Sequence, residues 1–140
     1  MITKGVKQLV AEAEAEIETI EVEDAKALVG DEDVVIVDIR DVRELWREGM
    51  IPGALHAPRG MLEFWVDPES PYHREVFANG KKFVLYCAGG FRSALATKAL
   101  QEMGFSPVAH IGGGFKAWQE AEYPIEEKEQ KIQKSAEKEK

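Results

Sequence analysis

Residues 83–93 read FVLYCAGGFRS and contain the only cysteine of the chain, Cys87. The four apolar or aromatic residues before Cys87 are typical of a strand covered on both faces. Residues 93–103 repeat apolar side chains at the spacing of a helix. The sequence therefore predicts that Cys87 opens a tight loop between the carboxyl end of a buried strand and the start of a helix.

The loop after Cys87 is suited to holding an anion. Gly89 and Gly90 allow the backbone to curl so that successive N–H groups point inward, and the following helix adds its positive end. A thiolate is itself an anion, so Cys87 is predicted to be ionised and nucleophilic near neutral pH. This context favours a reactive cysteine over a small buried apolar residue.

Two charged residues have candidate roles around this loop. Arg92 either pairs with an anionic substrate or ties the loop to a carboxylate such as Asp38 or Glu44, and the sequence leaves both roles open. Asp38 ends a second buried strand, predicted over residues 34–38, so it should lie at the same edge of the sheet. An unpaired carboxylate there would oppose ionisation of the thiol. Asp38 is therefore predicted to accept backbone or arginine hydrogen bonds and to hold the loops.

The loop resembles the active-site loop of the rhodanese family of sulfurtransferases, in which a cysteine opens a short loop and carries a sulfane sulfur as a persulfide. The match runs from Cys87 to Arg92 and is followed by Ser93. Further matching segments are VDIR at 37–40 with Glu44, GMIPGALHAP at 49–58, GGGFKAW at 112–118 and YPI at 123–125. Their order and spacing together are more specific than any single segment.

The resemblance implies roles for individual residues. Cys87 would be catalytic, and the rest of the loop would bind the substrate. The substrate-binding residues implied are Ala88, Gly89, Gly90, Phe91, Arg92 and Ser93, with structural support from Asp38, Arg40 and Glu44. The resemblance also implies a rhodanese-like three-layer α/β fold, in which helices cover both faces of a mostly parallel five-stranded sheet. The alternation of predicted strands and helices points to the same class of fold.

The composition indicates one soluble globular domain. The chain has 140 residues, 44% of them hydrophobic and 31% charged, which is enough to bury a core without disulfides or metals. Its apolar runs are shorter than the ~18 residues that a membrane helix needs. The net charge of −8 disfavours nucleic acid and anionic membranes as partners.

A cytoplasmic location is predicted from the cysteine content and the N-terminal segment. A single cysteine cannot form an internal disulfide, which suits a reducing compartment. Four glutamates between residues 12 and 18 interrupt the apolar stretch that a signal peptide would need. His56, His73 and His110 show no metal-ligand spacing and are interpreted as structural or surface residues. Neither a metal nor a cofactor is expected.

Three segments are predicted along the chain: residues 1–18 with an amphipathic helix from Lys4 to Glu18, a rhodanese domain at 19–126, and a charged tail at 127–140. The helix is interpreted either as a clasp on its own domain or as a contact in a homodimer. The other elements expected are strands at 19–22, 34–38, 54–57, 83–86 and 108–111, and helices at 23–29, 41–46, 93–103 and 115–121.

The expected function is sulfur transfer by double displacement. Cys87 would take a sulfane sulfur from thiosulfate or a persulfide, which a persulfide-carrying protein could also supply, and pass it to cyanide or a thiol. Thiosulfate-favouring relatives commonly have basic residues where this chain has Ala88 and Gly89, so a persulfide donor fits the loop better than the thiosulfate dianion.

Two alternatives come from other classes of protein. The first is a phosphatase or arsenate reductase of the cysteine-loop type, in which the arginine usually comes one residue later than it does here. The second is a non-enzymatic rhodanese-like interaction module, whose N-terminal helix or charged tail recruits a partner. Activity on a phosphate ester would favour the first, and failure to acquire sulfur from any donor would favour the second.

Overall fold

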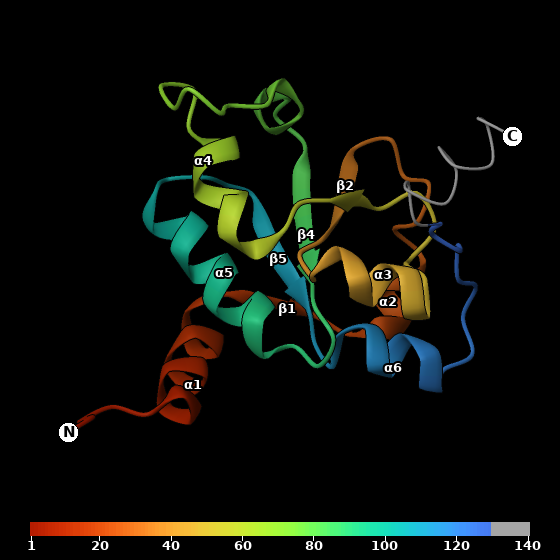
Figure 1. Ribbon diagram of the computed structural model, residues 1–140, viewed down its shortest axis with the longest axis horizontal. Coiled ribbons are helices and arrows are strands. Elements are labelled where there is room, and N and C mark those ends of the chain that lie inside the picture. The colour runs from red at the N-terminus through yellow and green to blue at the C-terminus, as the bar shows by residue number, and fades with distance from the viewer. Residues whose placement is uncertain (130–140) are drawn as a thin grey trace, which may run out of the picture.

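Five strands form one sheet at the centre of the protein (Figure 1). The computed structural model describes residues 1–129. In order across the sheet the strands are β1 (Glu18–Ile20), β5 (Val108–Ile111), β4 (Lys82–Tyr86), β2 (Val34–Asp38) and β3 (Leu55–His56). All four pairings between them are parallel, so the predicted five-stranded α/β fold is confirmed.

Helices cover both faces of the sheet. Figure 1 shows α1 (Val6–Glu16), α4 (Leu62–Val66) and α5 (Phe91–Glu102) on the left, and α2 (Val22–Lys26), α3 (Val42–Glu48) and α6 (Gly114–Glu120) on the right. Two short 3-10 turns, Arg59–Met61 and Glu75–Ala78, lie in the connection between β3 and β4. This arrangement buries the central strands, which explains why β4 and β2 are apolar on nearly every position.

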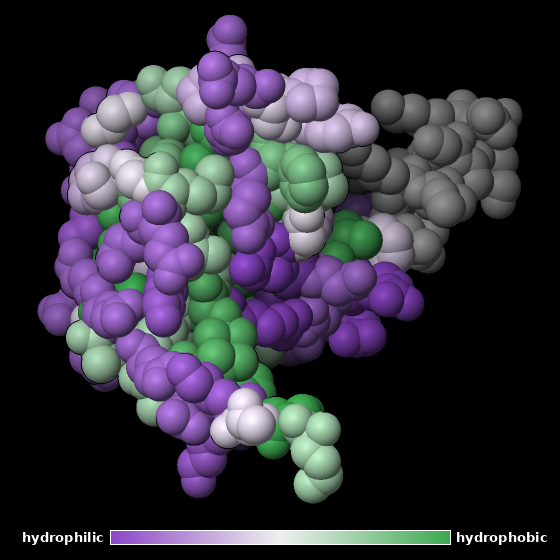
Figure 2. Space-filling model, turned by 90° about the vertical axis from the view of Figure 1, so that its left-hand side faces the viewer, coloured by the Kyte–Doolittle hydropathy of each residue, from purple (hydrophilic) through white to green (hydrophobic). Residues whose placement is uncertain are grey.

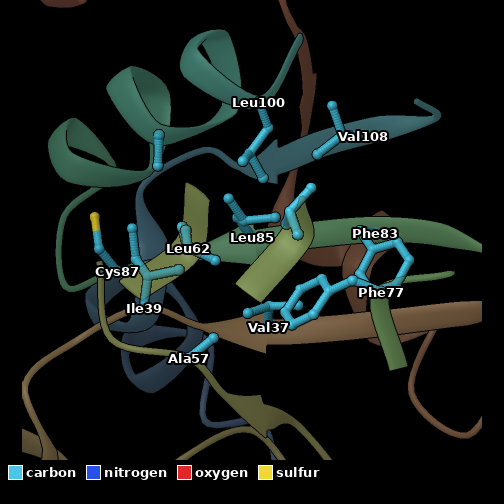
Figure 3. Packing of buried hydrophobic residues seen from close by; sticks show 12 residues of the cluster. Val37, Ile39, Ala57, Leu62, Phe77, Phe83, Leu85, Cys87, Leu100 and Val108 are labelled. Carbon is cyan, nitrogen blue, oxygen red and sulfur yellow. The ribbon is translucent and has the colours of Figure 1, made fainter. Parts of the chain in front are cut away.

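The alternation of side chains along the strands divides the core into two apolar clusters. In β4, Phe83 and Leu85 point to the cluster under α5, whereas Val84 and Tyr86 point to the opposite cluster. Figure 3 shows the first cluster, with Cys87 at its end beside Ile39. The candidate nucleophile therefore belongs to the face of the sheet that α5 covers.

The N-terminal helix α1 packs on α5. Val10 and Ala13 are buried against Ala94, and the Gln101 side chain donates a hydrogen bond to the carbonyl oxygen of Glu16 at 3.1 Å. Figure 2 shows this side of the molecule as largely hydrophilic, with hydrophobic residues in several patches, one of them at the height of the N-terminus and α1. The exposed large apolar residues at the N-terminus, on these two helices and at the C-cap of α5 are Met1, Ile2, Val6, Leu9, Phe91 and Met103.

Several predicted boundaries differ from the structure. The first helix begins after Gly5, which is extended, and ends before Ile17, whose extended backbone leads directly into β1, so it is shorter than the predicted span from Lys4 to Glu18. The second helix ends at Lys26 because residues 27–30 form turns. Residues 130–140 of the predicted tail lie outside the described part of the chain. No helix among residues 1–129 is long and apolar enough to cross a membrane.

Candidate active site

The loop between β4 and α5 is held in place by the start of α6. The carbonyl oxygens of Cys87 and Ala88 accept hydrogen bonds from the N–H groups of Phe115 and Lys116, at 2.8 and 2.9 Å. The two segments approach so closely that a Cβ on Gly114 would lie 2.5 Å from the Cys87 carbonyl oxygen. Because these carbonyls face α6, the N–H groups that follow in the loop are free to point to the sulfur.

The sulfur of Cys87 accepts hydrogen bonds from two backbone N–H groups. The N–H of Gly90 lies 3.1 Å from Sγ, and the N–H of Ser93, in the first turn of α5, lies 3.4 Å away. Gly90 adopts a φ of 101°, which only glycine adopts without strain. Cys87 itself is 1% exposed. These donors favour a negatively charged sulfur over a neutral one.

The side chain of Arg92 points to α3 and forms a bidentate ion pair with Glu44. Both N–O distances are 3.0 Å. The pair lowers the pKa of Glu44, chiefly through the hydrogen bonds from Arg92, and raises the pKa of Arg92 in return. Glu44 also accepts a hydrogen bond from the N–H of Asp41, which closes the capping box at the start of α3. Arg92 could pair with an anionic substrate or tie the loop to a carboxylate, and its contact with Glu44 is the one that the second role requires.

Asp38 and Arg40 lie on the other face of the sheet from Cys87. Arg40 donates to both Asp38 oxygens, with the shortest distance at 2.7 Å, and both side chains are fully buried. Arg40 also donates to the carbonyl oxygen of Gly49 at 2.7 Å. The hydroxyl of Tyr86 accepts from the N–H of Ile51 at 3.0 Å, and burial together with Asp38 raises the pKa of Tyr86. These contacts fix the end of β2 to residues 49–51 rather than reaching the sulfur.

The remaining predicted loop residues form an open edge. Ala88 is half-buried, Gly89 is exposed, and Phe91 is 69% exposed. Ala88 and Gly89 line a shallow hollow of about 440 Å³ together with Glu48, Phe115, Lys116 and Gln119. Lys116 therefore brings a positive charge to this edge. It was not singled out in the sequence because it lies far along the chain.

His110, which the sequence analysis interpreted only as a structural or surface residue, lies beside the site. It lies in β5 directly beside Leu85 of β4, and its Nδ1 is 2.8 Å from the hydroxyl oxygen of Ser93. The one signal in the sequence is its place in the otherwise apolar run VAHI. Within residues 1–129, no group of three or more His, Cys, Asp or Glu side chains could hold a metal ion.

The fold and site define an α/β protein with a buried cysteine at the carboxyl edge of a parallel sheet. The family model of the rhodanese-like domain matches residues 21–121, and the chain belongs to that family. This membership supports an enzyme of the sulfurtransferase type. YtwF of Bacillus subtilis, which carries a provisional sulfurtransferase name, is 35% identical over 64% of this chain and 77% of its own length.

Other relatives carry different names. A solved structure from Rhodopseudomonas palustris is 58% identical with a TM-score of 0.87, covering 90% of this chain and 97% of that one. It is described as a protein of unknown function and a possible tyrosine phosphatase. The tRNA uridine(34) hydroxylase of Sinorhizobium medicae is 34% identical over 77% of this chain, which spans 33% of that protein. The comparisons thus establish the family but leave the specific activity to be derived from the site.

Proposed function

We propose that the protein is a sulfurtransferase that carries a sulfane sulfur on Cys87. The Cys87 thiolate attacks the outer sulfur of the donor, so an Sγ–S bond forms while the S–S bond of the donor breaks and the donor leaves as a thiolate or as sulfite. A thiol or cyanide then attacks the bound sulfur, and the Sγ–S bond breaks to return the Cys87 thiolate. No net oxidation is required, since both displacements exchange one sulfur atom between nucleophiles.

The observation that carries this proposal is the convergence of the Gly90 and Ser93 N–H groups on Cys87 Sγ, at 3.1 and 3.4 Å. Donors fixed in place by the loop stabilise negative charge as it moves on and off the sulfur, without having to reorganise. The start of α5 contributes its positive end at the same point. The loop therefore supports the ionised nucleophile that the first displacement needs.

The phosphatase alternative is less well supported by the position of Arg92. Phosphoryl transfer requires an arginine or a comparable donor to pair with the equatorial oxygens of the phosphate. Here both terminal nitrogens of Arg92 are bound to Glu44 at 3.0 Å. Only four residues separate Cys87 from Arg92, which makes the loop one residue shorter than is usual in phosphatases of the cysteine-loop type.

Mass spectrometry tests the proposal directly. After incubation with glutathione persulfide, the protein should gain the mass of one sulfur atom, and cyanide should remove this sulfur and release thiocyanate. Cys87→Ser should show neither event, because a serine hydroxyl is hardly ionised and cannot hold a sulfane sulfur. Turnover of p-nitrophenyl phosphate that depends on Cys87, without any sulfur uptake, would establish the phosphatase instead.

The donor is expected to be a persulfide rather than thiosulfate. Ala88 and Gly89 place no cation on the loop, and Lys116 shares its hollow with Glu48. A dianion such as thiosulfate therefore meets little net positive charge at this edge, whereas a persulfide brings less charge near its reacting sulfur. Loading should be faster with glutathione persulfide than with thiosulfate at equal concentration. Failure to load from either donor would favour an interaction module without enzymatic activity.

A further inference from the structure

A chain of hydrogen-bonding side chains leads from the sulfur of Cys87 to the protein surface. Cys87 Sγ lies 3.5 Å from the hydroxyl oxygen of Ser93, which lies 2.8 Å from Nδ1 of His110. On the other side of the ring, Nε2 of His110 lies 3.1 Å from the hydroxyl oxygen of Thr19. Thr19 pairs with His110 in the register of β1 and β5 and is exposed to solvent.

The interior members of this chain are shielded from water. Ser93 is fully buried and His110 is 2% exposed, so each polar atom depends on its protein partners. Burial lowers the pKa of His110 to about 4, which keeps the imidazole neutral near pH 7. A neutral imidazole carries one proton on either nitrogen, and its partners decide which.

The charged groups of β1 and β4, the strands on either side of His110, pair with each other, and two of the three charged groups on α5, Arg92 and Lys98, have ion-pair partners on α3 and α1. Glu18 of β1 binds Lys82 of β4 at 2.8 Å, and Lys98 of α5 lies 3.6 Å from Glu16 of α1. The titratable group that the chain of contacts joins to His110 is Cys87. The charge of this thiol is therefore the variable to which the imidazole can respond.

The hydroxyl of Ser93 has one proton and several neighbours. It can donate to His110, to Cys87 or to the carbonyl oxygen of Gly90, which lies 3.3 Å away. When Cys87 is a thiol, its S–H can donate to Ser93 while the Ser93 proton goes to Nδ1 of His110. When Cys87 is a thiolate, the Ser93 hydroxyl makes its strongest hydrogen bond by donating to the sulfur. Nδ1 of His110 then no longer accepts this proton, so Nδ1 must carry a proton itself and donate to the Ser93 oxygen.

We propose that His110 is a positioning residue whose tautomer follows the charge of Cys87 and turns the Ser93 hydroxyl toward the thiolate. As Cys87 ionises, the S–H bond breaks and its proton passes to Ser93, while the Ser93 proton passes to Nδ1 of His110. In the same concerted step the Nε2 proton moves to Thr19, and the proton of Thr19 leaves to water. The imidazole stays neutral throughout, and the sulfur gains a third hydrogen bond. This inference rests on the proposed nucleophilic role of Cys87.

Nitrogen NMR of the labelled protein distinguishes the two tautomers of His110. The Nε2–H form is expected at pH values where Cys87 is a thiol, and the Nδ1–H form where it is a thiolate, with a change between them that coincides with the onset of iodoacetamide labelling. In Cys87→Ala the ring should keep one tautomer over the same pH range. A single tautomer at every pH in the unaltered protein overturns the proposal.

Labelling kinetics test the effect on the sulfur. Ser93→Ala keeps the backbone N–H but removes the hydroxyl, so the labelling rate at pH 7 should fall about tenfold, as expected for one hydrogen bond to a charged group. His110→Phe should have a similar effect, and His110→Asn should recover part of the rate because its amide can still face Ser93. Wild-type pH profiles in both Ser93→Ala and His110→Phe would overturn the proposal.

Thr97→Val is the matched control. Thr97 lies one turn after Ser93 on the same face of α5, and its buried hydroxyl has no hydrogen-bond partner in the described part of the chain. Its removal should leave labelling unchanged, and equal losses in Thr97→Val and Ser93→Ala would overturn the proposal. Labelling and NMR do not require sulfur transfer. A protein that accepts no sulfur but shows the coupled tautomer change would refute the proposed function while supporting this inference.

Discussion

Asp38 and Arg40 show how a buried ion pair fixes a loop. Both side chains are fully buried, and the Arg40 guanidinium lies 4.2 Å from the centre of the Phe115 ring. Burial alone would lower the pKa of Arg40, but its hydrogen bonds to Asp38 and the charge of that carboxylate outweigh burial and raise it. Such a pair contributes little net stability over an apolar replacement, but removing only one partner is costly because the other charge is left buried and unpaired. Its value here is the link to the Gly49 carbonyl at 2.7 Å.

Replacing one member of this pair should therefore be worse than replacing both. Arg40→Met leaves the Asp38 carboxylate buried without its partner, and the free energy of unfolding should fall by about 3–5 kcal/mol. The double variant Asp38→Asn with Arg40→Met should recover part of this loss. Urea unfolding gives both values, and Arg43→Met, which breaks an exposed ion pair with Asp41, serves as a control with little effect. A double variant less stable than Arg40→Met would contradict this view.

The ion pair between Glu44 and Arg92 allows its two suggested roles to be separated. Glu44→Gln keeps an acceptor for the capping box but removes the charge of the ion pair. Because Arg92 is half-exposed, the free energy of unfolding should fall by only about 0.5–1 kcal/mol. If Arg92 only ties the loop, Arg92→Ala and the double variant Glu44→Gln with Arg92→Ala should show a similar fall in the free energy of unfolding. The rate at which Cys87 is loaded with sulfur should then change equally in the two single variants and the double variant. Much slower loading in Arg92→Ala alone would show that Arg92 binds the donor.

The same pair predicts a pH dependence of known sign. Because Arg92 lowers the pKa of Glu44 in the folded protein, the stabilisation is complete above the ordinary glutamate pKa of about 4.3 and is lost as the pH falls through the lower folded value. The stability difference between the unaltered protein and Glu44→Gln should thus shrink in acid. Unfolding curves near pH 7 and in this acidic range measure it, and a constant difference would contradict the pairing.

Local pattern in the sequence was sufficient to locate the loop after Cys87 but not its surroundings. Cys87 and Gly90 could be identified because a strand, a glycine turn and a helix start follow one another within residues 83–93. His110 could not, because its contact with Ser93 depends on the register of β5 against β4 and on the packing of α5, which no short segment encodes. The partner of Arg92 stayed open for the same reason.

Among the elements, α1 depends on its contact with α5. Its N-cap, Gly5, makes no side-chain hydrogen bond, and neither acidic residues in the first turn nor basic residues in the last complement the helix dipole. The helix is therefore held by its contact with α5 rather than by its own sequence. The periodic apolar positions predicted this helix, while its ends followed from the extended backbone at Gly5 and Ile17, which periodicity does not show.

Substitution of two valines on α1 distinguishes the two interpretations of this helix, a clasp on its own domain or a contact in a homodimer. Val10 is 6% exposed and packs near Ala94, so Val10→Ala should lower the free energy of unfolding by about 2 kcal/mol. Val6 is 66% exposed, so Val6→Ala should leave the stability of a monomer almost unchanged. Thermal unfolding combined with light scattering measures both effects. Loss of a dimer in Val6→Ala would show that the exposed side of α1 is a subunit contact.

At the scale of the whole molecule, the local positive potential at the candidate site and the net negative charge of the protein act on an anion in opposite directions. The loop lies at the carboxyl edge of the parallel sheet, where the positive end of α5 and the N–H groups attract an anion. The chain as a whole carries a net charge of −8, which repels an anion at longer range. Salt screens the long-range field first, because the Debye length falls from ~30 Å at 0.01 M to ~3 Å at 1 M.

Iodoacetate and iodoacetamide measure this balance at Cys87, because they are similar in size and differ by one negative charge. Relative to 2-mercaptoethanol under the same conditions, iodoacetate should label Cys87 more slowly than iodoacetamide at low salt, and the gap should narrow as salt is added. Lys116→Ala should widen the low-salt gap while leaving iodoacetamide labelling unchanged, because Lys116 supplies the positive charge beside Ala88 and Gly89. Preferential labelling by iodoacetate at low salt would mean that the local positive potential exceeds the repulsion, and a dianionic donor such as thiosulfate would then fit the site.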